Sequence, residues 1–256
     1  MLDRHRKILE ILAEKDNISV AELSKMLSVS EVTIRADLTA LADEGKVQRV
    51  HGGAQLLEER VRQEHSFQIR RNQNAESKQK IGKYAAQFVE SLDSILLDSS
   101  TTVLAMAKAL RDRTDLKETT VIPTGIWTAI ELMSCQNINV LMPSGYLRSI
   151  SGSITGLPTS EFFENLNIQK AFLGAWGVSI KHGLTDSHLL EIELKKMIIR
   201  KAQEVIILVD GSKFIQNGLA AYSDIKNVLK IVTDKNAPKS VLKEIKSLGI
   251  EVHIVD

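Results

Sequence analysis

The chain has 256 residues, of which 43% are hydrophobic and 25% charged, and its net charge is +1. This composition is typical of a globular protein and excludes disordered and fibrous classes, and the length predicts two domains. The longest apolar runs have the length of a strand, far below the ~20 residues of a membrane span, so no membrane partner is expected. The single cysteine, Cys135, excludes an internal disulfide and a cysteine metal cluster. We expect no cofactor and no metal.

The first residues lead directly into charged side chains without an apolar signal segment, so the cytoplasm is the expected compartment. Apolar spacing then indicates a first helix over residues 4–15. Ser19 and Glu22 have the spacing of a capping box, which begins a second, short helix. Ser30 is a suitable N-cap for a third helix, which Gly45 would end. The N-terminal region is therefore predicted to contain three short helices.

Alternating apolar and polar residues over 46–51, followed by the glycines 52–53, predict a small hairpin after the third helix. Residues 1–56 therefore form a predicted winged helix-turn-helix domain. Residues 57–75 are polar and are predicted to be a linker. Residues 76–256 are predicted to form the second domain.

The second domain alternates strand-like and helical segments, beginning with a helix over 76–91. Nearly continuous apolar strands separated by helices predict a mainly parallel, Rossmann-like α/β sheet covered on both faces. The expected strands are Ser94–Leu97, Thr120–Pro123, Ile138–Met142, Lys170–Leu173, Val205–Val209, Leu229–Thr233 and Glu251–Val255.

In a winged helix-turn-helix the third helix enters the major groove. Ile34, Leu38 and Leu41 form its apolar stripe, which turns the other side chains outward. Arginine holds a guanine with two hydrogen bonds, and hydroxyls reach phosphates or base edges. The expected DNA-binding residues are Ser28, Ser30, Val32, Thr33, Arg35, Ala36 and, in the hairpin, Arg49 and His51.

The charge balance does not by itself indicate DNA binding, because residues 1–56 carry eight Lys and Arg against nine Asp and Glu. The expectation depends on where the charges lie. In the alternative interpretation, Arg35 is a solvated helix residue that pairs with Asp37 or Glu31.

The same residues resemble the DeoR family of bacterial transcriptional regulators. The resemblance is carried by Val29–Leu38, Leu41, Gly45 and Arg49–Ala54, and it continues through Ser66-Phe67, Arg70 and Lys78. It covers essentially the whole chain. Ala36 stands where the family usually has a second basic residue.

A candidate anion site follows the first strand of the second domain. The amides at a helix N-terminus, together with hydroxyls, suit a phosphate, and open α/β sheets bind ligands at the carboxyl ends of their strands. Other predicted strands end in similar polar segments, and Lys213 provides a fixed positive charge. The residues expected at this edge are Asp98, Ser99, Ser100, Thr101, Thr102, Thr124, Gly125, Gly145 and Lys213.

The second domain also resembles the DeoR sensor domain, whose fold is similar to ribose-5-phosphate isomerase and the amino-sugar-phosphate deaminases. The resemblance rests on 98–102, Thr124-Gly125, 143–145, Gly174–Gly177, Gly183–Thr185, Glu191 and 210–214, and it adds Thr185 and Glu191 to the expected ligand site. Three residues depart from the common pattern: Trp176 replaces an aspartate, Ser100 a glycine and Gly125 an asparagine.

The resemblance implies a repressor of a carbohydrate-metabolism operon, released from operator DNA by a phosphorylated sugar. Homo-oligomerisation is expected because two-fold symmetry matches palindromic operators. One alternative is a sugar-phosphate isomerase or deaminase, but the segment 174–179 contains no acid. Asp98, Asp186, His188 and Glu191 remain as possible acid or base groups, with Asp186 and His188 more readily explained as caps or solvent-facing residues.

Another alternative is a second domain that serves only for assembly. The apolar residues Leu189, Leu190, Leu194 and Ile198 would then pack between subunits.

Overall fold

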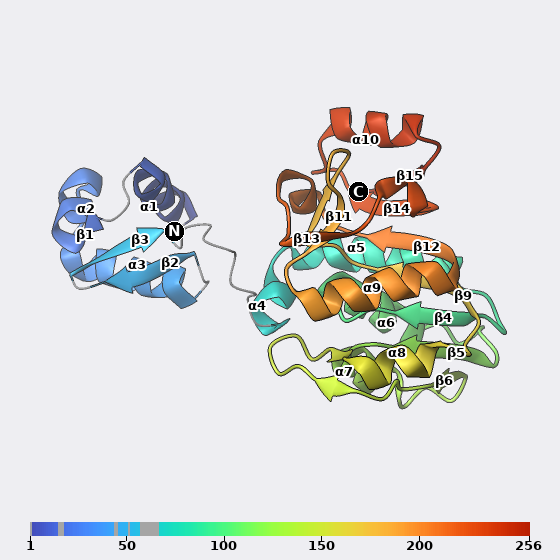
Figure 1. The fold of residues 1–256 in the computed structure, drawn as a ribbon. Helices are drawn as coiled ribbons and strands as arrows, with labels where there is room; N and C mark the ends of the chain where they lie inside the picture. Colours follow the sequence, from blue (N-terminus) through green and yellow to red (C-terminus); the bar gives the residue numbers. More distant parts are fainter. Residues whose placement is uncertain (1, 15–17, 44–45, 51, 57–66) are drawn as a thin grey trace. The chain divides into compact units, whose positions relative to one another are not determined.

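The computed structural model describes residues 2–14, 18–43, 46–50, 52–56 and 67–256 (Figure 1). Contacts divide the chain into two compact units, residues 1–65 and residues 66–256. No helix in these ranges is both long enough and apolar enough to cross a membrane.

The first unit contains three helices and a small antiparallel sheet, which confirms the predicted winged helix-turn-helix. Its elements are α1 (Leu2–Glu14), β1 (Ile18–Ser19), α2 (Val20–Leu27), α3 (Glu31–Asp43), β2 (Val47–Val50) and β3 (Gly53–Leu56). The strands lie in the order β1-β3-β2, with every pair antiparallel.

Local sequence signals explain where α2 and α3 begin. The Ser19 hydroxyl accepts from the Glu22 amide at 3.2 Å, and the Glu22 carboxylate accepts from the Ser19 amide at 3.0 Å, so the capping box is present. The Ser30 hydroxyl accepts from the Thr33 amide at 3.2 Å and begins α3. The predicted terminator Gly45 lies outside the described residues.

A buried carboxylate joins α1 to α3. Asp37 Oδ2 accepts from Arg4 Nε at 2.5 Å, Asp37 Oδ1 accepts from Arg4 Nη2 at 2.9 Å, and His5 Nε2 lies 3.1 Å from Oδ1. The hydrogen bonds from Arg4 hold the pKa of Asp37 below its usual range. Asp37 is only 3% exposed, so leaving it unpaired would be costly. Together with the apolar cluster of Ile34, Leu38 and Leu41, this contact fixes α3 in the domain.

The second unit is built on a seven-stranded sheet that contains all seven predicted strands. They are β4 (Ser94–Leu97), β5 (Thr119–Pro123), β6 (Ile138–Val140), β9 (Ile168–Leu173), β12 (Ala202–Leu208), β14 (Lys230–Asp234) and β15 (Glu251–Val255). Their order is β15-β14-β12-β9-β4-β5-β6, and every pair is parallel.

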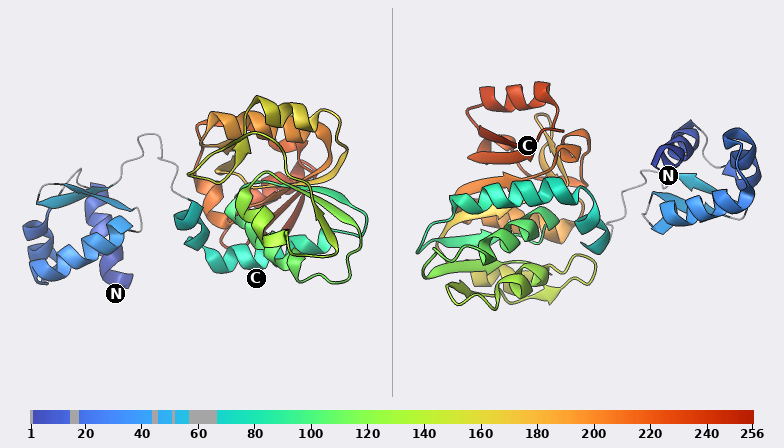
Figure 2. Two further views of the ribbon diagram at one scale, coloured as in Figure 1. Left: turned by 90° about the horizontal axis from the view of Figure 1, so that it is seen from below. Right: turned by 180° about the vertical axis from the view of Figure 1, so that it is seen from behind.

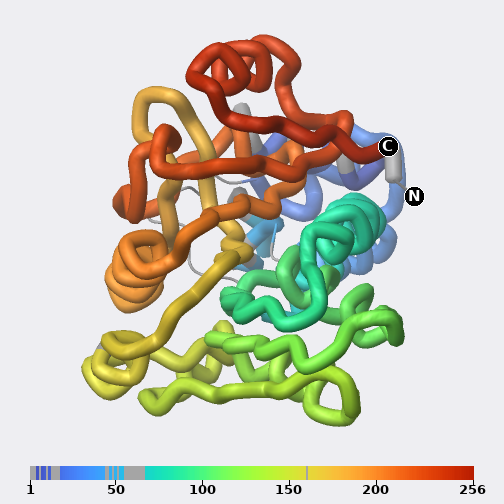
Figure 3. The backbone as a smooth tube through the Cα atoms, turned by 90° about the vertical axis from the view of Figure 1, so that its right-hand side faces the viewer, coloured from blue at the N-terminus to red at the C-terminus, as the bar shows by residue number. Residues whose placement is uncertain are grey.

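Helices cover both faces of this sheet, as expected for a parallel α/β fold. One face is covered by α5 (Ala75–Ala85), α6 (Thr101–Arg111) and α7 (Ile126–Leu132), and the other by α8 (Leu157–Phe163), α9 (Leu189–Lys201) and α10 (Lys239–Ser247). Figure 2 shows α5 and α6 lying side by side, and Figure 3 shows α9 and α5 on opposite sides of the sheet.

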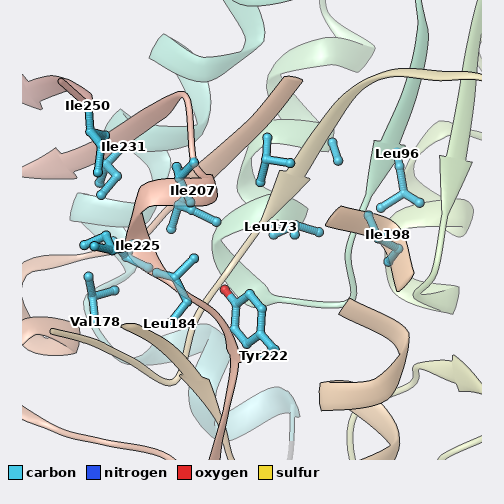
Figure 4. Packing of buried hydrophobic residues seen from close by; sticks show 14 of the residues in the cluster. Leu96, Leu173, Val178, Leu184, Ile198, Ile207, Tyr222, Ile225, Ile231 and Ile250 are labelled. Atoms are coloured by element: carbon cyan, nitrogen blue, oxygen red, sulfur yellow. The ribbon is translucent and has the colours of Figure 1, made fainter. Parts of the chain in front are cut away.

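Successive strand residues alternate between two cores. Ile95 and Leu97 join the cluster under α5 and α6, whereas Leu96 joins the cluster under α9. The cluster under α9 extends from Leu96 and Ile198 to Ile231 (Figure 4). It also contains Val178, Leu184 and Tyr222, which lie on short strands outside the main sheet.

Several short elements were not predicted. They are α4 (Phe67–Asn72), the 3-10 helices η2 (Gly211–Ile215) and η3 (Ile225–Asn227), the hairpin of β7 (Tyr146–Leu147) and β8 (Ile154–Thr155), and the antiparallel sheet of β10 (Gly177–Ser179), β11 (Gly183–Asp186) and β13 (Ala220–Ser223). The 3-10 helix η1 (Ala86–Phe88) lies within the predicted helix over 76–91. The predicted linker 57–75 therefore extends too far, because residues 67–75 belong to the second unit. Phe67 is 4% exposed, and the Phe67 and Trp127 rings stack at 5.8 Å.

We expect Asp37→Asn to destabilise the first unit by about 1–3 kcal/mol, because Arg4 and His5 lose their anionic acceptor. Since the pKa of Asp37 is lowered in the folded state, its contribution is present above its unfolded-state pKa of about 4 and is lost as the pH falls further. Amide hydrogen exchange of α1 and α3 in the full chain at neutral pH measures the effect. Asp43→Asn, at the exposed end of α3, is the control. Equal exchange in both variants would contradict the role of Asp37.

Candidate functional site

The outward face of α3 carries the residues expected to contact DNA. Val32 is 77% exposed, Arg35 and Ala36 are exposed, and Thr33 is half-buried. Ser28, Ser30 and Arg49 are also exposed. His51 lies outside the described residues, so its expected contact stays a prediction. Ile34, Leu38 and Leu41 are fully buried, which confirms the predicted stripe.

Side-chain contacts hold the basic groups of this face in place. Arg35 Nη2 lies 3.1 Å from Glu31 Oε2, an exposed ion pair one helical turn apart, so Arg35 has the Glu31 partner of the alternative interpretation. Asp37 is not available to Arg35 because it binds Arg4. Arg49 of β2 donates to Thr39 Oγ1 at 3.0 Å, which joins the hairpin to α3. The Arg35–Glu31 pair is solvent-exposed, and ion pairs of this kind are weak.

The second candidate site lies where the sheet order reverses. The chain runs from β4 outward to β5 and β6, then returns to β9 on the other side of β4 and continues to β12. The carboxyl ends of β4 and β9 therefore border a topological switch point, the usual ligand site of such sheets. Asp98 joins the two strand ends: Oδ1 accepts from the Ser100 amide at 2.8 Å, and Oδ2 accepts from the Gly174 amide at 2.7 Å.

The helix α6 begins at this point. Ser100 is its N-cap and accepts from the Val103 amide at 3.3 Å. Thr101 and Thr102 form the first turn, and within the described residues their amides have no hydrogen-bond partner. The positive end of the dipole of α6, an 11-residue helix, lies at these amides. Free amides at a helix N-terminus are an arrangement that binds anions.

Two glycines allow the neighbouring loops to approach this turn. A Cβ on Gly125 would lie 2.9 Å from Ser99 Cα, and a Cβ on Gly174 would lie 2.6 Å from Ser100 Cβ. Gly125 and Ser100 both depart from the family pattern, and here each of them is part of such a close approach. The structure therefore brings Asp98–Thr102, Thr124 and Gly125 together, as the sequence predicted.

A buried lysine, Lys195, binds the residues that form this site, and the sequence analysis did not predict it. Lys195 of α9 lies 3.1 Å from Asp98 Oδ2 and 2.6 Å from Asp186 Oδ2, and it donates to the Gly174 carbonyl at 2.7 Å. Burial disfavours its charge, but Asp186 and Asp98 outweigh that cost and hold the pKa of Lys195 above its ordinary value. Tyr222 donates to the same carbonyl at 3.0 Å, and burial raises the pKa of Tyr222 far above its usual range.

Glu191, in the first turn of α9, lies beside Ser99 and collects several donors. Ser99 Oγ donates to its Oε2 at 3.4 Å, and Arg148 Nη1 donates to its Oε1 at 2.7 Å. Ser151 and Ser153 also donate to Oε1. Arg148, Ser151 and Ser153 belong to the β7–β8 hairpin and were not predicted, because nothing in the sequence marks them as neighbours of Glu191.

Three other expected residues lie farther from this cluster or have structural partners. Thr185 Oγ1 donates to the Gly177 carbonyl at 3.1 Å and accepts from the Gly218 amide at 2.8 Å. Gly145 packs against Thr159 at the start of α8, and none of its described contacts reaches Ser99. Lys213 Nζ lies 5.4 Å from the centre of the ring of Trp176. Trp176 belongs to the loop that follows β9.

Asp186 and His188 have different roles. His188 caps α9, with Nδ1 accepting from the Leu190 amide at 3.2 Å, which confirms one expectation. Asp186 is buried against Lys195, so its description as a cap or solvent-facing residue was wrong. Among the described residues, no three His, Cys, Asp or Glu side chains are grouped as a metal site requires.

Lys78 of α5 binds the end of α4. Its Nζ donates to the carbonyls of Arg70 at 2.5 Å and Gln73 at 2.6 Å. Burial lowers the pKa of Lys78 to about 8, and nearby Asp210 opposes the shift. Asp210 accepts from Asn74 Nδ2 at 2.9 Å through Oδ1, and its buried Oδ2 has no hydrogen-bond partner among the described residues.

Comparisons with known proteins identify both units. The DeoR-like helix-turn-helix domain matches residues 4–60. The DeoR C terminal sensor domain matches residues 73–235, more than half of the chain. The chain belongs to the DeoR family of transcriptional regulators. It is a DNA-binding regulator with a C-terminal sensor domain.

Similar proteins cover nearly the full length of this DeoR-family regulator. The HTH-type transcriptional regulator GolR of Listeria innocua is 35% identical over 254 residues, 99% of this chain and 98% of that protein. The glycerol-3-phosphate regulon repressor of Escherichia coli is 29% identical over 251 residues, 98% of each. A solved ribose 5-phosphate isomerase from Methanocaldococcus jannaschii is 21% identical over 55% of each chain, with a TM-score of 0.42, and no activity follows from that overlap.

We expect Lys78→Met to change how stability depends on pH. The folded-state pKa is lowered, so the cost of burying the charge is full below about pH 8 and is relieved as the pH rises toward the unfolded value. Between pH 7 and 9.5 the free energy of unfolding of the wild type should rise by about 2 kcal/mol relative to the variant. Urea unfolding at both pH values measures this difference.

The control is Lys83→Met, at an exposed residue of the same helix. Its free energy of unfolding should depend on pH as that of the wild type does. Parallel pH dependence of the wild type and Lys78→Met would contradict the lowered pKa.

Proposed function

We propose that this DeoR-family regulator is a repressor of a carbohydrate-metabolism operon, and that a phosphorylated sugar bound at the switch point releases it from operator DNA. The observation that carries the proposal is the meeting of the β4 and β9 ends at the first turn of α6. There the Thr101 and Thr102 amides and the Ser99 hydroxyl lie together. This group of donors suits a phosphate.

The names of the relatives support the same function. One is a glycerol-3-phosphate regulon repressor, and another is a putative aga operon transcriptional repressor, 28% identical over 254 residues. The first of these names contains a small phosphorylated polyol. A phosphate with a short hydroxylated chain has the chemistry that this site would recognise.

A sensor is favoured over a catalyst. Proton transfer next to a carbonyl needs a positioned acid or base. Asp98 and Asp186 are buried and bound to Lys195. Glu191 pairs with Arg148, and His188 caps a helix. The segment after β9 contains Trp176 and no acid. The acid and base candidates are therefore engaged in holding the structure together.

Assembly into a homo-oligomer is part of the proposal. Leu189 and Leu190 are 60% and 45% exposed at the start of α9, and an exposed apolar surface of this kind suits a subunit contact. Leu194 and Ile198 are buried in the core and are not available to a second subunit. Two copies would place two α3 helices on a symmetric operator.

Arg35→Ala should weaken operator binding about tenfold or more, because a good arginine contact to a base contributes about 1–3 kcal/mol. Fluorescence anisotropy with the DNA upstream of the chain's own gene, at physiological salt, measures the loss. Lys243→Ala, an exposed residue of α10 with the same charge change, is the control. Glu31→Gln removes the competing carboxylate and should strengthen binding. Unchanged affinity of Arg35→Ala would remove Arg35 from the DNA contact.

Lys213→Ala should abolish the response to effector while operator affinity stays intact, since the cation that balances the phosphate is lost. The readout is anisotropy of the operator complex titrated with ribose 5-phosphate, glucosamine 6-phosphate and glycerol 3-phosphate. A thermal shift gives a second readout, because a ligand at about 100 times its Kd stabilises by about 2.7 kcal/mol. Lys243→Ala is again the matched control, and a Lys213→Ala protein that is still released normally would refute the role of Lys213.

A further inference from the structure

The residues that surround Glu191 also reach the point where the chain enters the second unit. Phe67 is the first described residue after position 66, and its amide donates to the Ile150 carbonyl at 2.9 Å. Ile150 directly precedes Ser151, whose hydroxyl contacts both Arg148 and Glu191. A single turn of the β7–β8 hairpin therefore binds Phe67 through one residue and Glu191 through the next.

Backbone contacts also hold this turn, among them the Arg148 amide to the Ser153 carbonyl at 2.8 Å and the Ile154 amide to the Thr124 carbonyl at 2.8 Å. Ser153 pairs with Gly125 in an isolated antiparallel bridge, and the Ile126 amide donates to the Gly152 carbonyl at 2.8 Å. Gly152 has a φ of +70°, and a Cβ there would lie 2.7 Å from Trp127 Cδ1, so the turn passes closely over the ring that stacks on Phe67. The β7–β8 hairpin is a two-residue ladder. The ion pair between Arg148 and Glu191, with side chains 13% and 6% exposed, joins the turn to α9.

Glu191 is also the group that a bound anion would disturb first. Its carboxylate accepts from Ser99, two residues before the amides of Thr101, so a phosphate at α6 would approach a carboxylate of the same sign. The two anions would compete for the Ser99 hydroxyl, and like charges in a buried site repel strongly. Phosphate binding at α6 therefore requires Glu191 to give up part of its contacts with Ser99 and the hairpin turn.

We infer that the Arg148–Glu191 pair senses the anion and that it controls the docking of Phe67. This rests on the proposed function, because it needs a phosphate at the first turn of α6. With the anion bound, Glu191 releases the turn 148–153, and the Ile150 carbonyl no longer holds the Phe67 amide. The start of α4 then loosens where the chain leads back toward the DNA-binding unit. Arg148, Ser151 and Ser153 are positioning residues that link ligand occupancy to this segment.

Hydrogen exchange of the Phe67 amide in the full-length protein tests the inference, with inorganic phosphate as the probe and calorimetry to measure its binding. In the wild type, saturating phosphate should speed this exchange at least tenfold. Glu191→Gln should exchange fast without phosphate and should bind phosphate at least threefold more tightly, because the competing charge is gone. A merely structural role of Glu191 would not raise the affinity. In Arg148→Gln the Phe67 amide should exchange fast, and phosphate should no longer change its rate. Arg148→Lys should restore part of the change that phosphate causes.

The matched control is Lys170→Gln, which breaks another largely buried ion pair, Lys170–Asp93 at 2.7 Å, with side chains 15% and 10% exposed. Its Phe67 amide should behave as in the wild type. If phosphate binds and the exchange of Phe67 does not change, the inference is wrong while the proposed ligand site stands. If neither phosphate nor ribose 5-phosphate binds to the wild type, both fail.

Discussion

The candidate ligand site depends on Asp98, a carboxylate only 1% exposed that follows strand β4, the neighbour of the central strand β9. It accepts from the Ser100 and Gly174 amides and pairs with Lys195, so the ends of β4 and β9 and the helix α9 meet at one side chain. A buried charge with these partners is stable, and with one partner removed it would be costly. The first turn of α6 is therefore held in a fixed position before any ligand arrives, which is what tight recognition of a small anion requires.

The DNA-binding unit uses the same physical device. Asp37 lies buried on α3 and fixes α1 through Arg4 and His5, while the opposite face of α3 presents Arg35 and Val32 to solvent. The buried Asp37 carboxylate therefore fixes the helix whose exposed face carries Arg35 and Val32. The weak overall charge balance of this region is consistent with that arrangement, because Asp37 contributes to the count but not to the DNA-facing surface.

Sequence patterns predicted the elements that depend on local chemistry. The seven strands of the main sheet are apolar runs, and the caps Ser19 and Ser30 act over three residues, so both could be read from the chain. Contacts between segments distant in the sequence determine the short antiparallel strands, the helix α4 and the partners of Glu191. A local sequence pattern does not predict such contacts. Lys195 did have a signal, because its spacing from Glu191 and Ile198 places a lysine on the buried face of α9. A charge on such a face requires carboxylate partners.

An experimental structure of the full chain with ribose 5-phosphate or glycerol 3-phosphate shows whether a phosphorylated sugar binds at the junction of β4 and β9. We expect the phosphate oxygens to accept hydrogen bonds from the amides of Thr101 and Thr102. A phosphosugar bound away from the first turn of α6, with these amides facing no ligand, would contradict the proposal.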